Sequence, residues 1–230
     1  MKRSEIILAV IFWLLLIADC ILIKEGLNEY RLFTKILLVP VLLVGIFNAT
    51  EETKHRRSKV LANLAFFFCF LGDFFLLGEG NNGYFIAGLG SFMLAHIFFT
   101  IFFFRLKKFT DKYRIFLFAN GFLIFGYMGF LLFLSWNGVK RQNLEIPIAV
   151  YAFVLGMMVL TAVHSINNKS IKRISKNYFV PGALLFVLSD SLLAFDKFVT
   201  AFVYGPVAVM VTYAAAIFFL YLGVVRFLKK

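Results

Sequence analysis

The chain has 230 residues, of which 62% are hydrophobic, 19% aromatic and only 16% charged, and its mean hydropathy is +0.89. Soluble domains are about 45–50% apolar and about 25% charged, so this composition excludes a soluble globular enzyme, a secreted disulfide scaffold and a disordered chain. It indicates an integral membrane protein.

Eight apolar stretches follow one another along the chain, each close to the length of about 20 residues that a helix needs to cross the hydrocarbon core. The second stretch is the shortest and contains Pro40, but neighbouring helices can satisfy a backbone group that a proline leaves unpaired. The connections are short. We therefore predict one all-α domain over residues 1–230, a polytopic bundle of eight transmembrane helices, with spans at 6–23, 33–49, 60–78, 84–104, 115–135, 146–165, 179–196 and 202–225.

The formal net charge of +12 comes from basic residues in the connections. If the spans alternate in direction, the connections on one side carry 18 of the 24 lysines and arginines, and the other side keeps six. By the positive-inside rule, both termini are predicted to be cytoplasmic. This explains the charge without nucleic acid as a partner, and we expect a multi-pass protein of a bacterial-type plasma (inner) membrane.

Three aspartates lie inside predicted spans, where a charged side chain costs about 2.5–3.5 kcal/mol on insertion scales. Asp19 lies nearer an interface, whereas Asp73 and Asp190 lie at nearly the same depth near the outer ends of their spans, since a helix rises about 1.5 Å per residue. Other polar residues fall at or near this outer layer: Ser91, His96, Tyr151, Ser189 and Ser191.

Residue spacing indicates which way Asp73 faces. Ala65, Cys69 and Asp73 follow one another at i, i+4 and i+8, so the carboxyl group continues a stripe of small residues of the kind that lets membrane helices approach closely. Asp73 is therefore expected to face protein. His96 lies on the flank of a similar stripe, from which its ring can reach the bundle interior.

Each of these residues also has a purely structural interpretation. An isolated membrane aspartate can be neutral and bonded to a neighbouring helix, and His96 can be a packing histidine. Lys35 can extend its ammonium group to the membrane surface, and Tyr151 and Tyr213 can be ordinary amphipathic packing residues. The shared depth of several polar residues is what these interpretations explain poorly.

A zinc-dependent hydrolase is a competing interpretation. Such a site needs three histidines, or two histidines with a carboxylate, around one metal ion. The chain has three histidines. His55 and His164 lie in or beside predicted cytoplasmic loops, where we expect them to be solvated. We therefore predict no metal ligands and no cofactor.

Four segments together resemble the YhhN-like lysoplasmalogenase family, and the resemblance covers nearly the whole chain. They are FLGD at 70–73, GSFMLAH at 90–96, VYA at 150–152 and GALLFVLSDSLLA at 182–194. The resemblance implies eight membrane helices and hydrolysis of the vinyl ether bond of lysoplasmalogens, giving a fatty aldehyde and a glycerophosphoethanolamine or glycerophosphocholine. The suspected acidic pair of the family falls on Asp73 and Asp190.

The chemistry of this reaction fits two carboxyl groups in different protonation states. Protonation of the vinyl carbon β to oxygen gives an oxocarbenium ion, and water captures it, much as in glycosidases. Burial away from water favours the neutral form of a carboxyl group. We expect catalysis by Asp73 and Asp190, with the roles of acid and base left open, and with His96 holding a carboxylate or water.

A lysophospholipid substrate and membrane lipid are the expected partners, and the sequence leaves the oligomeric state open. The simplest expectation is access from the outer leaflet, with Lys35 near the lipid phosphate. Substrate-binding residues are expected at Lys35, Ser91, Tyr151, Ser189 and Tyr213. Two alternatives remain: a proton- or cation-coupled small-solute transporter that uses the same acids, although broken half-helices and repeats are not evident, and a membrane protein without chemistry.

Overall fold

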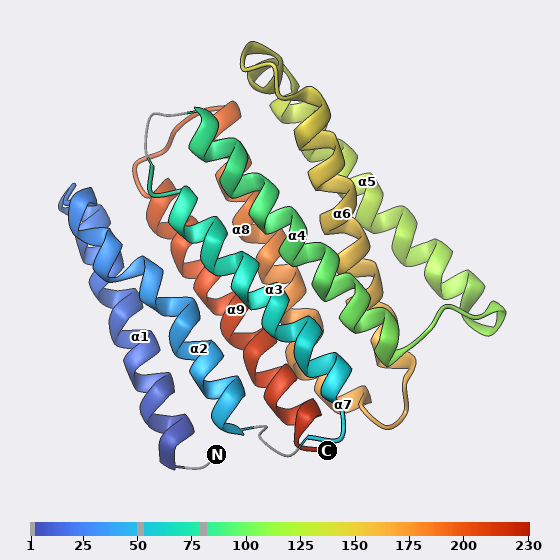
Figure 1. Ribbon diagram of the computed structural model, residues 1–230. Helices are drawn as coiled ribbons and strands as arrows, with labels where there is room; N and C mark the ends of the chain where they lie inside the picture. The colour runs from blue at the N-terminus through green and yellow to red at the C-terminus, as the bar shows by residue number, and fades with distance from the viewer. Residues whose placement is uncertain (1–2, 50–52, 79–81) are drawn as a thin grey trace.

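The computed structural model describes residues 3–49, 53–78 and 82–230, and the chain within them is built from helices joined by short connections (Figure 1). The α-helices are α1 (Arg3–Lys24), α2 (Lys35–Ala49), α3 (Arg56–Phe75), α4 (Asn82–Leu106), α5 (Arg114–Arg141), α6 (Glu145–His164), α7 (Lys172–Ile174), α8 (Val180–Phe198) and α9 (Gly205–Leu228). Short 3₁₀ turns are η1 (Asn28–Phe33), η2 (Asp111–Tyr113) and η3 (Ser165–Asn167), and a π-helix, η4 (Ser175–Phe179), joins α7 to α8.

Within the described residues, eight helical segments are long and apolar enough to cross a membrane. The eight predicted spans are thereby confirmed as helices, and the protein is an integral membrane protein. Pro40 lies inside α2, as the prediction of a second span required. Pro206 lies in the first turn of α9, where a missing N–H costs nothing.

Two boundaries differ from the prediction in ways that matter for the site. Helix α3 ends at Phe75 rather than at residue 78, so Asp73 lies in the last turn of the helix. The seventh span starts at Lys172 and not at 179. Basic residues lower the hydropathy of this first part, whereas its helical hydrogen bonding continues through η4 into α8.

The helices pack as a bundle with α1 and α5 at opposite margins (Figure 1). Helix α9 lies against α8, α1, α2 and α3, while α6 lies against α4, α5 and α8. The start of α1 and the end of α9 lie at the same end of the bundle, where Glu5 and Lys229 form an ion pair. The start of α2, the end of α3, the end of α8 and the start of α9 lie at the other end of the bundle (Figure 1).

The stripe on α3 faces the protein interior, as its spacing predicts. Ala65 and Cys69 are fully buried, and Asp73 is 1% exposed. Gly72 allows the close contact of α3 with α4, because a Cβ atom there would lie 2.6 Å from the ring of Phe92. Small residues on α3 thus let a carboxyl group reach the middle of the bundle.

Candidate functional site

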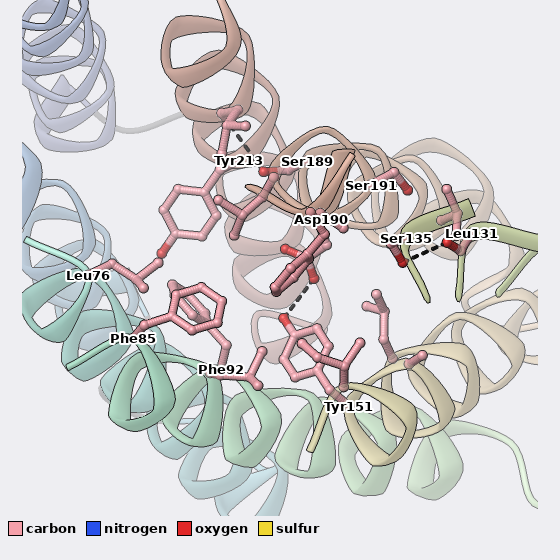
Figure 2. Close-up of a pocket in the computed structure, with 18 of the residues that line it drawn as sticks. Leu76, Phe85, Phe92, Leu131, Ser135, Tyr151, Ser189, Asp190, Ser191 and Tyr213 are labelled. Atoms are coloured by element: carbon pink, nitrogen blue, oxygen red, sulfur yellow. Dashed lines mark hydrogen bonds between the residues drawn. The ribbon is translucent and has the colours of Figure 1, made fainter. Parts of the chain in front are cut away.

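An apolar pocket lies between α3, α4, α5, α6, α8 and α9, with Lys35 at the start of α2 also at its wall, and its cavity volume is about 120 Å³. Figure 2 shows Asp190 and Tyr151 in its middle. Of the eight residues expected from the sequence to act in catalysis or substrate binding, six line this pocket, and two, Ser91 and His96, do not. The six are Lys35, Asp73, Tyr151, Ser189, Asp190 and Tyr213.

Asp73 is held by residues from two further helices. Tyr213 of α9 donates a hydrogen bond of 2.7 Å from its hydroxyl to Asp73 Oδ2. Lys35, the first residue of α2, places its Nζ atom 3.9 Å from Asp73 Oδ1. The ammonium group and the phenol hydroxyl together compensate for a negative charge on a carboxylate that is otherwise enclosed by protein.

Asp190 belongs to a chain of hydrogen bonds that runs across α8, α6 and α4. The hydroxyl of Tyr151 donates to Asp190 Oδ2 at 2.7 Å, and His96 Nε2 lies 3.0 Å from the same hydroxyl oxygen. Because the phenol proton points to Asp190, Nε2 carries a proton and donates to Tyr151. His96 Nδ1 is buried and makes no hydrogen bond to the described residues.

The two aspartates differ in their access to the pocket. The Asp190 side chain is 16% exposed, whereas that of Asp73 is 2% exposed. Asp190 therefore offers more of its surface to a molecule in the pocket. Asp73 is the more enclosed of the two and lies beside the ammonium group of Lys35.

The serine hydroxyls of the site are engaged with backbone carbonyl groups. Ser189 lines the pocket but donates to the Val209 carbonyl oxygen of α9 at 3.0 Å. Ser91 donates to the Ala87 carbonyl oxygen at 2.8 Å within its own helix. Nothing in the geometry supports the substrate-binding role expected of Ser91, whose hydroxyl bonds the preceding turn of α4 instead of facing the pocket.

Two polar residues outside the pocket have partners of their own. Asp19 is fully buried and accepts two hydrogen bonds from the Arg31 guanidinium, both 3.3 Å long, and one of 2.8 Å from the hydroxyl of Thr34. This cluster fixes η1 and the start of α2, from which Lys35 extends to Asp73. Asp19 is therefore bonded within this cluster and does not line the pocket.

The expectation that His164 is solvated was wrong. Its side chain is fully buried, its Nε2 atom lies 3.1 Å from the Lys108 carbonyl oxygen, and the rings of Phe109 and Tyr113 pack against it. The aromatic residues of the α4–α5 connection fold over the end of α6 and exclude water. His55 stacks on Phe227 with ring centroids 4.5 Å apart.

Sequence reasoning missed Tyr127, which connects α5 to the site. Its hydroxyl donates to Ser191 Oγ at 3.0 Å, next to Asp190. Tyr127 lies on a helix with many other aromatic residues, so its sequence context gives no signal. Arg31 lies between the first two predicted spans, and the structure shows that it pairs with Asp19.

Among the described residues, no three histidine, cysteine, aspartate or glutamate side chains converge as the ligands of a metal ion do. The titratable side chains that line the pocket are instead two carboxyl groups, two phenols and one ammonium group. This set is suited to moving protons and holding charge on an otherwise apolar molecule.

Comparisons with known proteins agree with the segments that suggested a family. The model of the YhhN family matches residues 30–224, a range that includes every residue lining the pocket. The lysoplasmalogenases of Mycobacterium bovis and Mycobacterium tuberculosis are each 29% identical to this chain over 145 residues. That alignment covers 63% of the chain and 52% of each relative, so the chain spans about half the length of the curated relatives it matches.

No solved structure matches the chain. The family match covers most of the sequence, and the chain belongs to the YhhN family.

Proposed function

We propose that this protein hydrolyses the vinyl ether bond of lysoplasmalogens, releasing a fatty aldehyde and a glycerophosphoethanolamine or glycerophosphocholine. The observation that carries the proposal is the pair Asp73 and Asp190, two carboxyl groups on different helices that face one apolar pocket in the membrane region. The family match and the similarity to two lysoplasmalogenases support this activity.

We assign the proton donor to Asp190, because its side chain is the more exposed to the pocket. Its carboxyl proton passes to the vinyl carbon β to oxygen, and the π electrons form the new C–H bond. The product is an oxocarbenium ion beside two carboxylates. Tyr151 occupies Oδ2 of Asp190, so Oδ1 is the atom that carries the proton to the substrate.

We assign the ionised role to Asp73, because Lys35 and Tyr213 compensate for its charge. Water adds to the carbon that bears the oxygen and loses a proton to Asp73, giving a neutral hemiacetal. The hemiacetal C–O bond then breaks: the hydroxyl proton returns to Asp190, and the glyceryl oxygen takes its proton from Asp73. Both carboxyl groups end in their starting states, and one water is consumed.

His96 is the residue that keeps Tyr151 in position. It is fully buried and lies behind Tyr151, outside the pocket, so it acts on the reaction through the phenol hydroxyl. Nε2–H of His96 donates to the oxygen of Tyr151, and the hydroxyl of Tyr151 donates to Asp190. His96 is thus a positioning residue in this mechanism.

Lys35 gives the pocket a cationic end. Its Nζ atom lies at the pocket wall beside Asp73, where an ammonium group can also attract the phosphate of a lysolipid. We further propose a bacterial-type plasma (inner) membrane with both termini in the cytoplasm, in line with the distribution of basic residues. In that orientation Lys35 and Asp73 lie toward the outer leaflet.

The proposed chemistry is tested by running the reaction of the purified protein with a lysoplasmalogen in D₂O and trapping the aldehyde as a hydrazone. Protonation of the vinyl carbon places one deuterium on the aldehyde carbon next to the carbonyl group, which mass spectrometry detects. Aldehyde that carries no deuterium, or no release of aldehyde by folded protein, would contradict the mechanism. The saturated 1-alkyl lysolipid is the matched control and should not be cleaved.

A further inference from the structure

The pocket has two chemically different ends, separated by Asp190 and Tyr151. Tyr213 lies toward one end, with Asp73 and Lys35 beyond its hydroxyl, and Leu131 of α5 lies at the other (Figure 2). The first end therefore carries a cation and a carboxylate. The second is walled by α5, with Leu155 of α6 and Leu193 of α8 also lining the pocket.

One face of α5 supplies the wall of this apolar end. Met128, Leu131, Leu132 and Ser135 line the pocket at the spacing i, i+3, i+4 and i+7, which places them on one side of a helix. The hydroxyl of Ser135 donates to the Leu131 carbonyl oxygen at 2.8 Å, so it is already paired within its own helix. The inner face of α5 thus presents hydrocarbon to the pocket.

The opposite face of α5 is exposed on the outside of the bundle. Phe133, the next residue after Leu132, is 78% exposed. Helix α5 packs against α6 and α8 and lies at the margin of the bundle (Figure 1). The inner face of α5 therefore lines the pocket, and its outer face meets the surrounding lipid.

We propose that the inner face of α5 is the binding site for the hydrocarbon chain of the lysolipid, with the glycerophosphate directed to Lys35. This proposal rests on the proposed function and adds the orientation of the substrate and the residues that read its chain. A cavity of this volume holds a segment of about six carbon atoms. The vinyl group and the first methylenes fill it, and the remainder of the chain continues along α5 toward the membrane.

The orientation is tested by photo-crosslinking, which requires binding but no catalysis. The probe is a saturated 1-alkyl lysophospholipid that carries a diazirine at carbon 6 of its chain, bound to the wild-type protein in detergent. The expected labels, located by mass spectrometry, lie on the inner face of α5, at Met128, Leu131, Leu132 or Ser135, or on Leu155. Labels on α2 or on the end of α3 would show the reverse orientation and overturn the proposal.

Chain recognition is tested with Leu132→Trp, matched with Phe133→Trp on the outer face of the same helix. Overfilling the inner face should lower kcat/KM for a 1-hexadecenyl lysolipid about tenfold or more. A 1-propenyl lysolipid, which has almost no chain, should lose much less, and Phe133→Trp should leave both substrates unchanged. An equal loss for both substrates with Leu132→Trp, or none, would overturn the proposal.

A second variant covers the case in which the tryptophan prevents folding. Leu132→Ala enlarges the same wall and should raise the relative turnover of a chain with a methyl branch near the vinyl group. An unchanged preference in Leu132→Ala would count against the site. If wild-type protein binds the probe along α5 but releases no aldehyde, the proposed function fails while the chain site stands.

Discussion

At the scale of single residues, the site depends on what each aspartate is bonded to. The cost of a carboxyl group in a membrane pointed to Asp73 and Asp190 from sequence, and both line one pocket. The partners could not be assigned in the same way, because Tyr213 is 140 positions from Asp73 and Tyr151 is 39 from Asp190. The depth of a residue in the membrane follows from its position along its own helix. Which side chain of another helix it meets depends on how the two helices are rotated in the bundle.

The bond between Tyr151 and Asp190 gives a residue-level prediction. Tyr151→Phe removes the hydroxyl that holds Oδ2 and separates His96 from the site. Hydrogen bonds to charged groups contribute about 1.5–3 kcal/mol, so kcat should fall about tenfold to a hundredfold. Steady-state aldehyde release measures this, with Tyr30→Phe, a change at an exposed tyrosine of η1, as the control. Unchanged kcat in Tyr151→Phe would remove this hydrogen-bond chain from the mechanism.

At the scale of helices, the length of the apolar runs predicted the number of spans, because the membrane imposes a minimum length on each. The end of the third helix and the start of the seventh were less accurate. Both errors arise where the boundary of helical hydrogen bonding and the boundary of the apolar run fall at different residues. This happens after Asp73 at the end of α3 and at the π-helix Ser175–Phe179 before α8. The contact of α5 with α8 was not predictable, since it depends on Gly138, which lies beyond the end of the predicted fifth span.

Two glycines of α5 give a matched prediction for this contact. A Cβ atom on Gly138 would lie 1.9 Å from the Phe198 carbonyl oxygen, whereas one on Gly126 would meet no atom within 4 Å. Gly138→Ala should therefore destabilise the protein by about 1–3 kcal/mol, because backbone must move to admit the methyl group. Gly126→Ala should be neutral or stabilising by up to about 1 kcal/mol. Thermal unfolding in detergent distinguishes the two, and equal melting temperatures would contradict the close packing of α5 on α8.

At the scale of the whole molecule, the termini lie at one end of the bundle, and the start of α2 and the end of α3, which carry Lys35 and Asp73, lie at the other (Figure 1). The excess of basic residues on the side of the termini predicts which end faces the cytoplasm. An even number of spans and the charge distribution are both visible in the sequence. The pocket is not, because it is formed by side chains from seven helices that meet only in the folded bundle.

The orientation in the membrane is tested by cysteine labelling in a background of Cys20→Ala and Cys69→Ala. Lys112→Cys and Lys140→Cys place single thiols at exposed positions on opposite sides of the predicted topology. A membrane-impermeant maleimide should label position 140 in intact cells and position 112 only in inverted membrane vesicles. The reverse pattern would invert the topology and place Lys35 and Asp73 toward the inner leaflet.

The most direct measurement for the whole account is aldehyde release from a lysoplasmalogen by wild-type protein, Asp73→Asn and Asp190→Asn, each shown to be folded by its thermal transition. Asparagine keeps the size of the side chain and removes the acid, so we predict aldehyde from wild type and a loss of at least about a hundredfold, typical of acid–base catalysts, in each variant. Full activity in either variant would contradict a mechanism that uses two carboxyl groups.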